Sequence, residues 1–282
     1  MIYYLMIIVS VCLFSTQFLL NNEYRKENGN TFNSSLKFSL YASISGFIAL
    51  AIINKFHFEI SLFSALVAAV YSLVCIALAY SSIKAFTYAN LSVYSVFSMI
   101  GGMLLPFVYG ILCGEEFKLI RVVCCLLIAV CVTLALNKTE HSKKAVKYYI
   151  AVFILNGMVG VISKFHQSFT ELCVDSGSFM MLTKIFAFVF SVILILMQKE
   201  KDFSVSKKAG LFAVLYSVVN SVGNLFLLMA LLHIPASVQY PIVTGGTIVV
   251  STLIGLIRRE KITKREILAA VVAFFATVFM AF

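Results

Sequence analysis

Residues 233–263 read HIPASVQYPIVTGGTIVVSTLIGLIRREKIT, and residues 88–118 read YANLSVYSVFSMIGGMLLPFVYGILCGEEFK. The two segments start 145 residues apart and align without a gap. Identical residues then coincide at five places: Ser92 with Ser237, Val93 with Val238, Gly101 with Gly246, Gly110 with Gly255 and Glu115 with Glu260. The same offset places Tyr3–Tyr4 on Tyr148–Tyr149 and Tyr71–Ser72 on Tyr216–Ser217. We infer that the chain consists of two related halves.

The composition indicates a membrane protein. The 282 residues have a mean hydropathy of +1.01, and 12% of them are charged, whereas soluble domains keep about 25% of their residues charged. Apolar runs long enough to cross a hydrocarbon core of about 30 Å fall at 2–20, 36–54, 59–80, 87–112, 118–137, 147–165, 176–198, 208–232, 235–257 and 264–281. The runs are too long for membrane-spanning strands and do not alternate. The sequence therefore predicts an all-α multi-pass membrane protein with ten transmembrane helices.

The basic residues predict the orientation. Of the 22 lysine and arginine residues, four lie in the connections after even-numbered runs (Lys55, Lys118, Arg121 and Lys164) and one, Lys184, lies inside an apolar run. The others all lie in the connections after odd-numbered runs. Because short cytoplasmic loops carry the excess of Lys and Arg, we expect the odd-numbered loops in the cytoplasm and both termini outside the cell. The formal charge of +10 thus indicates orientation in the cytoplasmic membrane and not a nucleic-acid partner.

The repeat predicts an inverted architecture. The offset aligns helix 1 with 6, 3 with 8, 4 with 9 and 5 with 10, so each half has five helices and the second half enters the membrane from the opposite side. We expect a first repeat at 1–137, a basic cytoplasmic linker at 138–147 and a second repeat at 148–282. Inverted repeats are typical of secondary transporters that work by alternating access, with the substrate site between the halves near the midplane.

The tail IPASVQYPIVTGGTIVVSTLIGLIRREKITKREILAAVVAFFATVFM resembles an EamA-type repeat of the drug/metabolite transporter superfamily. ALAYSSIKAFTYANLSVYSVFSMIGGMLLPFVYGILCGEEFKL is similar in the first half. The resemblance implies the fold and a transport role. The chain looks like a divergent member, since Arg259 precedes Glu260 where a glycine is usual, Val96 stands where the second half has Pro241, and the sequence contains no tryptophan.

Polar residues at helical spacing predict a lined cavity. In a membrane, polar helix faces turn toward a cavity or a neighbouring helix. The candidate substrate-binding residues are Lys184, Asn156, Tyr216, Asn220, Asn224, Gln239, Tyr240, Thr244, Tyr71, Tyr94 and Ser95. The alternative for the Ser and Thr positions is helix–helix adhesion through backbone hydrogen bonds.

Lys184 is the sharpest candidate, because a charge about eight residues into an apolar helix costs about 2.5–3.5 kcal/mol on insertion scales. The functional interpretation is an anion-binding or proton-responsive group in the cavity. The alternatives are a lysine that extends to the membrane surface, or one that pairs with Glu171 or Asp175 of the preceding loop.

The arrangement of the remaining polar groups indicates structural roles and not catalytic ones. The four histidines stand singly, and most of the seven cysteines lie inside apolar runs, so we expect no catalytic residues, no metal site and no cofactor. Glu115 and Glu260 lie at helix ends among basic residues. Beside Glu260, the sequence from Thr263 to Glu266 has the spacing of a capping box that opens the last helix.

These observations predict a secondary transporter, not an enzyme, that moves a small neutral, zwitterionic or anionic metabolite, such as an amino acid, organic acid or sugar derivative. Its partners are the substrate, the lipid bilayer and either a proton or a counter-substrate, with monomer and homodimer both open. One alternative is a cationic drug or metabolite exporter with a tyrosine-lined cavity. The other is a non-transporting accessory subunit of a lipid-linked sugar flippase.

Overall fold

The computed structural model describes residues 2–112, 127, 143–198, 201–234 and 236–279, and within these ranges all regular secondary structure is helical. The helices are α1 (Ile2–Asn28), α2 (Phe32–Ile53), α3 (Leu62–Ala85), α4 (Leu91–Leu112), α6 (Lys143–Ser168), α7 (Ser176–Leu196), α8 (Lys207–Leu231), α9 (Ala236–Ile257) and α10 (Lys264–Phe279). The predicted fifth helix at 118–137 and Glu115 lie outside the described residues, apart from Leu127. The predicted linker at 138–147 is described from Lys143, where α6 begins.

Seven of these helices are long and apolar enough to cross a membrane: α1, α2, α3, α4, α6 from Ala145, α7 and α8. In α9 the apolar stretch Ile242–Ile257 is shorter than these seven helices. Helix α10 has 16 residues. The all-helical prediction is therefore confirmed for the described residues.

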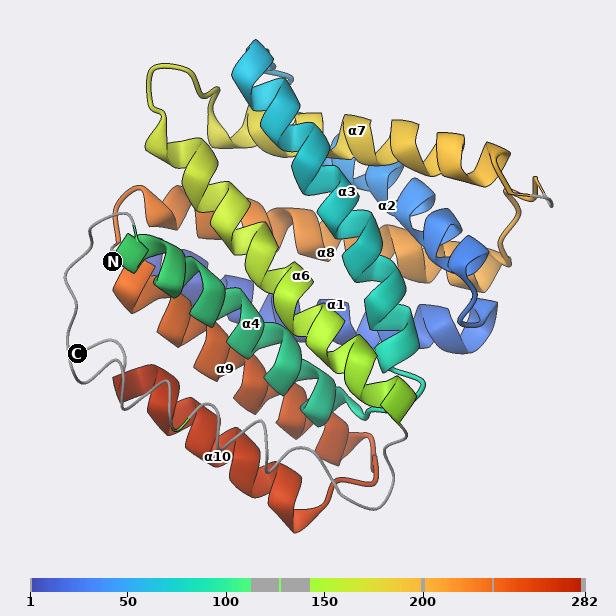
Figure 1. Ribbon diagram of the computed structural model, residues 1–282, viewed down its shortest axis with the longest axis vertical. Coiled ribbons are helices and arrows are strands. Elements are labelled where there is room, and N and C mark those ends of the chain that lie inside the picture. The colour runs from blue at the N-terminus through green and yellow to red at the C-terminus, as the bar shows by residue number, and fades with distance from the viewer. Residues whose placement is uncertain (1, 113–126, 128–142, 199–200, 235, 280–282) are drawn as a thin grey trace.

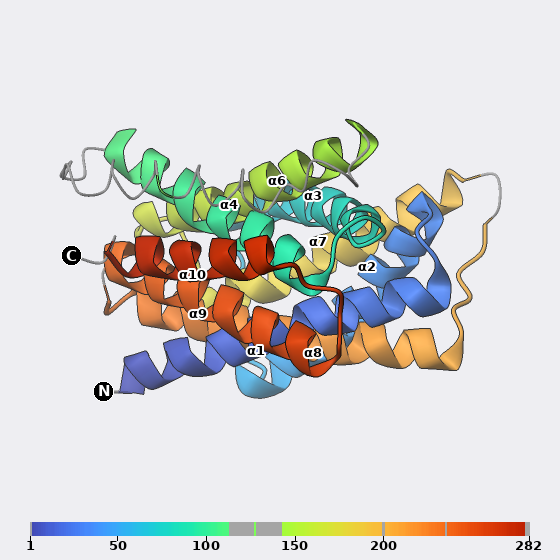
Figure 2. The ribbon, with the colours of Figure 1, turned by 90° about the horizontal axis from the view of Figure 1, so that it is seen from below.

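Successive helices run back and forth between two ends of the molecule (Figures 1 and 2), and some of them cross at a large angle, as α3 and α7 do in Figure 1. At the end that we call the basic end, α1, α3, α7 and α9 finish and α2, α4, α6, α8 and α10 begin. Hydrogen bonds between connections hold this end together, from Asn30 to Thr87 and from Asn90 to the carbonyl of Lys261. At the other end, which we call the Ser61 end, Ser61 Oγ donates to the carbonyl of Leu172 at 2.7 Å.

Local sequence sets the helix boundaries. Thr31, Ser61, Asp175 and Ser206 are N-caps whose side-chain oxygens accept hydrogen bonds from the first-turn amides of α2, α3, α7 and α8. The helix α1 continues to Asn28, eight residues beyond the predicted end of its apolar run, because no breaker interrupts it before Gly29. Gly29 has φ +79°, a conformation that glycine adopts without steric cost.

The two glutamates near the α9–α10 connection are structural. Thr263 and Glu266 form the predicted capping box, with Thr263 N donating to Glu266 Oε2 at 2.7 Å and Glu266 N donating to Thr263 Oγ1 at 3.3 Å. Glu260 Oε2 accepts from the amide of Leu91 at 2.9 Å. The glutamate that closes the second copy of the repeated segment therefore caps the first turn of α4, the helix of the first copy.

Most of the packing joins the two halves of the chain. Helix α1 packs on α8 and α9, α6 packs on α3 and α4, α2 packs on α7 and α8, α3 packs on α7, and α4 packs on α9. Hydroxyl groups bridge these contacts: Ser10 donates to the carbonyl of Gly223 at 3.0 Å, and Ser72 donates to the carbonyl of Thr183 at 2.7 Å. Such bonds and small residues hold helices together where lipid supplies no hydrophobic driving force.

Glycines allow the closest of these contacts, between α4 and α6. A Cβ atom on Gly101 would overlap the carbonyl oxygen of Phe153, and a Cβ atom on Gly157 would lie 2.6 Å from the carbonyl oxygen of Gly101. About one turn further along the same two helices, Pro106 of α4 packs against Gly160 of α6, where an added Cβ would lie 2.5 Å from the proline ring. These glycines bring the two backbones into direct contact.

We predict that Gly101→Ala destabilises the protein by about 1–3 kcal/mol, because the methyl group meets backbone and not a movable side chain. Unfolding of the detergent-solubilised protein measures the effect. The control is Gly210→Ala in the first turn of α8, where the new Cβ would lie 3.5 Å from its nearest neighbour. There the helix preference of alanine should stabilise by up to about 1 kcal/mol. A Gly101→Ala protein as stable as the control would contradict the close contact.

Candidate functional site

A cavity of about 180 Å³ lies in the middle of the bundle, and α1, α2, α3, α4, α6, α7, α8 and α9 all contribute lining residues. The described lining combines aromatic rings, amides, hydroxyls and a single charged side chain, Lys184. Because each helix turns only a few residues toward this space, the cavity exists only once both halves of the chain have come together.

The structure brings most of the predicted site residues to this cavity. Nine line it: Lys184, Asn156, Tyr216, Asn220, Asn224, Tyr240, Thr244, Tyr71 and Tyr94. Ser95 and Gln239 do not. Ser95 Oγ donates to the carbonyl of Ser92 at 2.8 Å inside α4, and Gln239 Nε2 donates to the carbonyl of Leu227 at 2.8 Å. These two fully buried side chains serve helix contacts.

Lys184 lies where α7 meets α2 and α8. A Cβ atom on Gly46 of α2 would lie 3.0 Å from Lys184 Cε and 2.8 Å from Ser221 Oγ, so the absent side chain of Gly46 makes room for the lysine stem. The Lys184 ammonium makes no ion pair or hydrogen bond within the described part of the chain. Neither Glu171 nor Asp175 pairs with it, so that sequence-based alternative is wrong. The lysine therefore offers the cavity an amino group with no counter-ion among the described residues.

The wall formed by α1 and α8 carries amides. Asn220 Nδ2 donates to Gln17 Oε1 at 2.6 Å, and Asn224 Nδ2 donates to the carbonyl of Asn220 at 2.8 Å. One turn beyond Gln17, the side chain of Asn21 also lines the cavity. Neither Gln17 nor Asn21 is among the residues predicted from the sequence: Gln17 lies within the first apolar run, and Asn21 lies beyond residue 20, where that run was expected to end. Their spacing of four residues on a continuing helix was the signal that could have found them.

Aromatic pairs frame the cavity on two sides. The ring of Tyr71 in α3 packs edge-on against Phe179 of α7, with centroids 5.8 Å apart. The ring of Tyr216 in α8 packs against Phe38 of α2 at 4.6 Å. Tyr71 and Tyr216 coincide under the 145-residue offset, and each receives its aromatic partner from the opposite half of the chain.

Two lining residues are already tied to neighbouring helices. Asn156 Nδ2 donates to the carbonyl of Ser98 at 2.6 Å, which joins α6 to α4. The hydroxyl of Tyr94 lies 2.7 Å from that of Ser82. The donor of Asn156 is therefore committed to packing, whereas the Lys184 ammonium is not.

Comparison with known proteins gives a family for the second half of the chain. The model of the EamA-like transporter family matches residues 144–282. That segment belongs to the EamA-like transporter family. A solved structure described only as "Crystal structure of protein" resembles the chain with a TM-score of 0.63 and 15% identity, covering 98% of this chain and 95% of the other. That likeness concerns the fold alone. No curated protein matches the chain. Together with the apolar helices, the family match makes this protein a multi-pass membrane transporter.

Ion pairs between the halves close the basic end of this EamA-like bundle. Glu23 of α1 pairs with Arg258 beyond α9 at 2.6 Å, and Glu27 of α1 pairs with Lys208 of α8 at 2.5 Å. Lys37 of α2 pairs with Asp202 of the α7–α8 connection at 2.5 Å and also donates to the carbonyl of Ser204. Hydrogen bonds from Lys37 and Ser204 hold the pKa of Asp202 well below its usual range.

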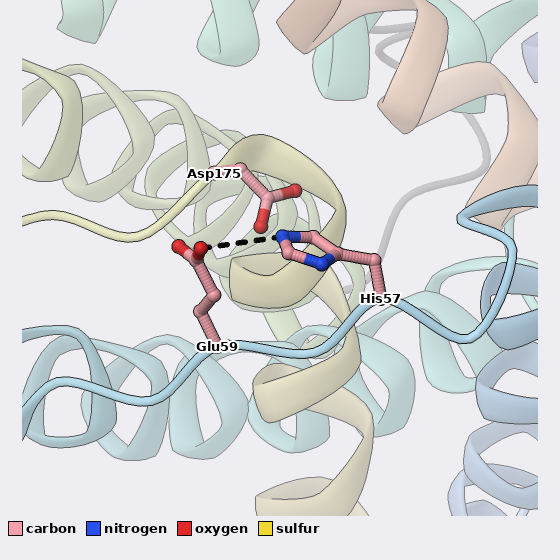
Figure 3. Close-up of side chains that lie close together, drawn as sticks. All are labelled: His57, Glu59 and Asp175. Carbon is pink, nitrogen blue, oxygen red and sulfur yellow. Dashed lines mark ion pairs between the residues drawn. The ribbon is translucent and has the colours of Figure 1, made fainter.

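The Ser61 end of the EamA-like bundle has a different chemistry. His57 Nε2 lies 3.3 Å from Glu59 Oε1, and Asp175 stands beside them at the start of α7 (Figure 3). One ligand atom from each residue lies within 4.8 Å of the others, a spacing that a divalent cation could bridge. All three side chains are exposed, and Asp175 Oδ1 already caps α7 through the amides of Gly177 and Ser178. This group lies outside the cavity.

We predict that Asp202→Asn lowers the thermal unfolding temperature at pH 7. The folded pKa of Asp202 is depressed, so its contribution is present above the usual carboxyl pKa of about 3.9 and is lost as the pH falls through the depressed value. The deficit relative to wild type should thus persist to about pH 4 and shrink only below it. Thermal unfolding as a function of pH measures this.

The matched control is Glu27→Gln. Its partner Lys208 has 64% of its side chain exposed, against 9% for Lys37, so Glu27→Gln should cost less than Asp202→Asn because solvent screens the exposed pair. Equal losses in the two variants, or a deficit for Asp202→Asn that disappears well above pH 4, would contradict this account of the basic end.

Proposed function

We propose that the protein is a secondary transporter that moves a small metabolite with an acidic group across the cytoplasmic membrane by alternating access. The observation that carries this proposal is Lys184, whose ammonium faces the central cavity without a counter-ion among the described residues. Placing a charge within an apolar bundle is costly, and an acidic group of the substrate would compensate it. Anionic and zwitterionic molecules both meet this requirement.

The size and charge of the cavity argue against the cationic alternative. Its volume of about 180 Å³ lies below the range of about 300–1,000 Å³ for sites that hold drug-sized ligands. None of the described lining residues is acidic, and a cation would meet the charge of Lys184. A non-transporting accessory subunit would have no use for a polar central cavity.

Helix packing supports the proposed inverted repeat. Exchanging α1 with α6, α2 with α7, α3 with α8 and α4 with α9 turns the α1–α8 contact into α6–α3, α1–α9 into α6–α4, and α2–α8 into α7–α3. The α2–α7 and α4–α9 contacts map onto themselves. All five kinds of contact are present. This is the pattern expected of two five-helix repeats, at 1–137 and 148–282, related by a two-fold axis in the membrane plane.

In this proposal, alternating access means that the basic end and the Ser61 end open in turn. Substrate would enter from one side while the other stays closed, and Lys184 would hold it between the halves. Opening the basic end requires the separation of ion pairs such as Lys37–Asp202. Opening the Ser61 end requires the loss of neutral contacts, among them the hydrogen bond of 2.9 Å from the Glu59 amide to Ser178 Oγ. By the excess of lysine and arginine, we place the basic end in the cytoplasm and both termini outside.

We predict that Lys184→Met weakens the binding of small organic anions by about tenfold to a hundredfold, because a hydrogen bond to a charged group contributes about 1.5–3 kcal/mol. Lys184→Arg should retain much of the affinity. The exposed-loop variant Lys201→Met is the matched control and should behave as wild type. Ligand-induced thermal stabilisation and uptake into proteoliposomes are the measurements. Anions that bind Lys184→Met as well as wild type would refute the role of Lys184.

We predict that a membrane-impermeant maleimide labels Cys173 in intact cells. Cys173 is a free, partly exposed thiol in the α6–α7 connection, at the end placed outside. The experiment uses two single-cysteine proteins, one that retains Cys173 and one with Lys201→Cys in the α7–α8 connection. Lys201→Cys should react only after the cells are opened. The reverse pattern would invert the proposed orientation, and labelling of both sites in intact cells would show insertion in both directions.

A further inference from the structure

The side chain of Asn21 in α1 lines the cavity and carries a hydrogen-bond acceptor that has no partner. Asn21 lines the cavity and is only 3% exposed. Its Oδ1 atom has no hydrogen-bond partner, although a buried acceptor without a partner is costly and uncommon in folded proteins. Nine buried polar atoms of the described residues have no partner, and Asn21 Oδ1 is the one among them whose residue lines the cavity, so this unpaired oxygen points to a ligand.

The neighbouring amides leave Asn21 free for that role. Gln17, one turn earlier, uses its Oε1 atom to accept from Asn220 Nδ2 at 2.6 Å. Asn224 donates to the carbonyl of Asn220 at 2.8 Å. These contacts hold the amides of the α1–α8 wall in place without using Asn21. The wall is therefore positioned before the ligand arrives, with one acceptor available.

The charges around the cavity restrict what Asn21 can bind. An amide oxygen accepts hydrogen bonds from hydroxyl, amide and ammonium groups. An ammonium group would need a compensating negative charge once removed from water, and no described lining residue is acidic. Lys184 already places one positive charge in the same space. A neutral donor, a hydroxyl or an amide N–H, is what this wall accommodates.

We propose that the transported molecule is an acid that also carries neutral hydrogen-bond donors, as hydroxylated or amide-bearing organic acids do. Its acidic group binds Lys184, and one of its hydroxyl or amide N–H groups donates to Asn21 Oδ1. This assignment rests on the proposed function, since it presupposes an acid at Lys184. It separates a hydroxylated or amidated acid from a fatty acid and from an amino acid.

The test uses ligands matched in length, with binding to the purified full chain measured by thermal stabilisation and calorimetry. Gluconate and glucuronate have an acid and hydroxyls, hexanoate has only the acid, 6-aminohexanoate adds an ammonium group, and sorbitol has only hydroxyls. We expect at least one hydroxylated acid to bind wild type about tenfold more tightly than hexanoate, 6-aminohexanoate or sorbitol.

The variant Asn21→Leu replaces the whole amide by an apolar group with the same number of side-chain heavy atoms. It should reduce the affinity of the hydroxylated acid about tenfold, to that of hexanoate, and leave hexanoate unchanged. Without ligand its unfolding temperature should equal or exceed that of wild type, because an apolar group replaces an unsatisfied one. The control Asn156→Leu breaks a hydrogen bond to Ser98 and should lower the unfolding temperature without ligand.

The possible results separate this inference from the proposed function. If hexanoate binds as tightly as the hydroxylated acids, or if Asn21→Leu changes none of the affinities, the role of Asn21 is refuted and the acid site at Lys184 stands. A preference for 6-aminohexanoate would replace the neutral donor by an ammonium group and overturn the inference. If no acid binds wild type, or if Lys184→Met binds them all equally well, the proposed function itself fails.

Discussion

A backbone amide in hydrocarbon has no water to bond, and the rest of the structure depends on this constraint. The chain meets it by forming long helices, nine of which lie in the described residues, and by capping their ends with Thr31, Ser61, Asp175 and Ser206. Once the backbone groups are hydrogen-bonded within helices, the polar side chains still need polar surroundings. Lipid excludes them, so they gather between the helices, where they either join two helices or line the cavity.

Direct helix contacts take most of these polar groups. Ser10, Ser72 and Asn156 bond backbone carbonyls of neighbouring helices, and Gly101 and Gly157 remove the side chains that would hold α4 and α6 apart. Nine buried polar atoms of the described residues have no partner, and each such group costs free energy. Among them, Asn21 Oδ1 belongs to a residue that lines the cavity.

The 145-residue offset relates the two halves in packing more than in chemistry. Tyr71 and Tyr216 coincide under it and frame one cavity from opposite halves. Lys184 coincides with Ser39, so the charge belongs to one half alone. In the proposed two-fold arrangement the two ends would open alternately, and the single lysine makes the lining of the cavity asymmetric. A substrate with distinct acidic and neutral parts fits such a lining better than a symmetric molecule.

Sequence by itself determined the helical class and the helix positions, because hydropathy and capping act over a few neighbouring residues; the box from Thr263 to Glu266 formed as its spacing predicted. The sequence also singled out Lys184, since a charged residue within an apolar run can be recognised from the order of the residues alone. Only the tertiary structure decided that Asn21 faces the cavity and that Gln239 does not. Residues on different helices have no covalent spacing that relates them, so their meeting depends on packing between the halves.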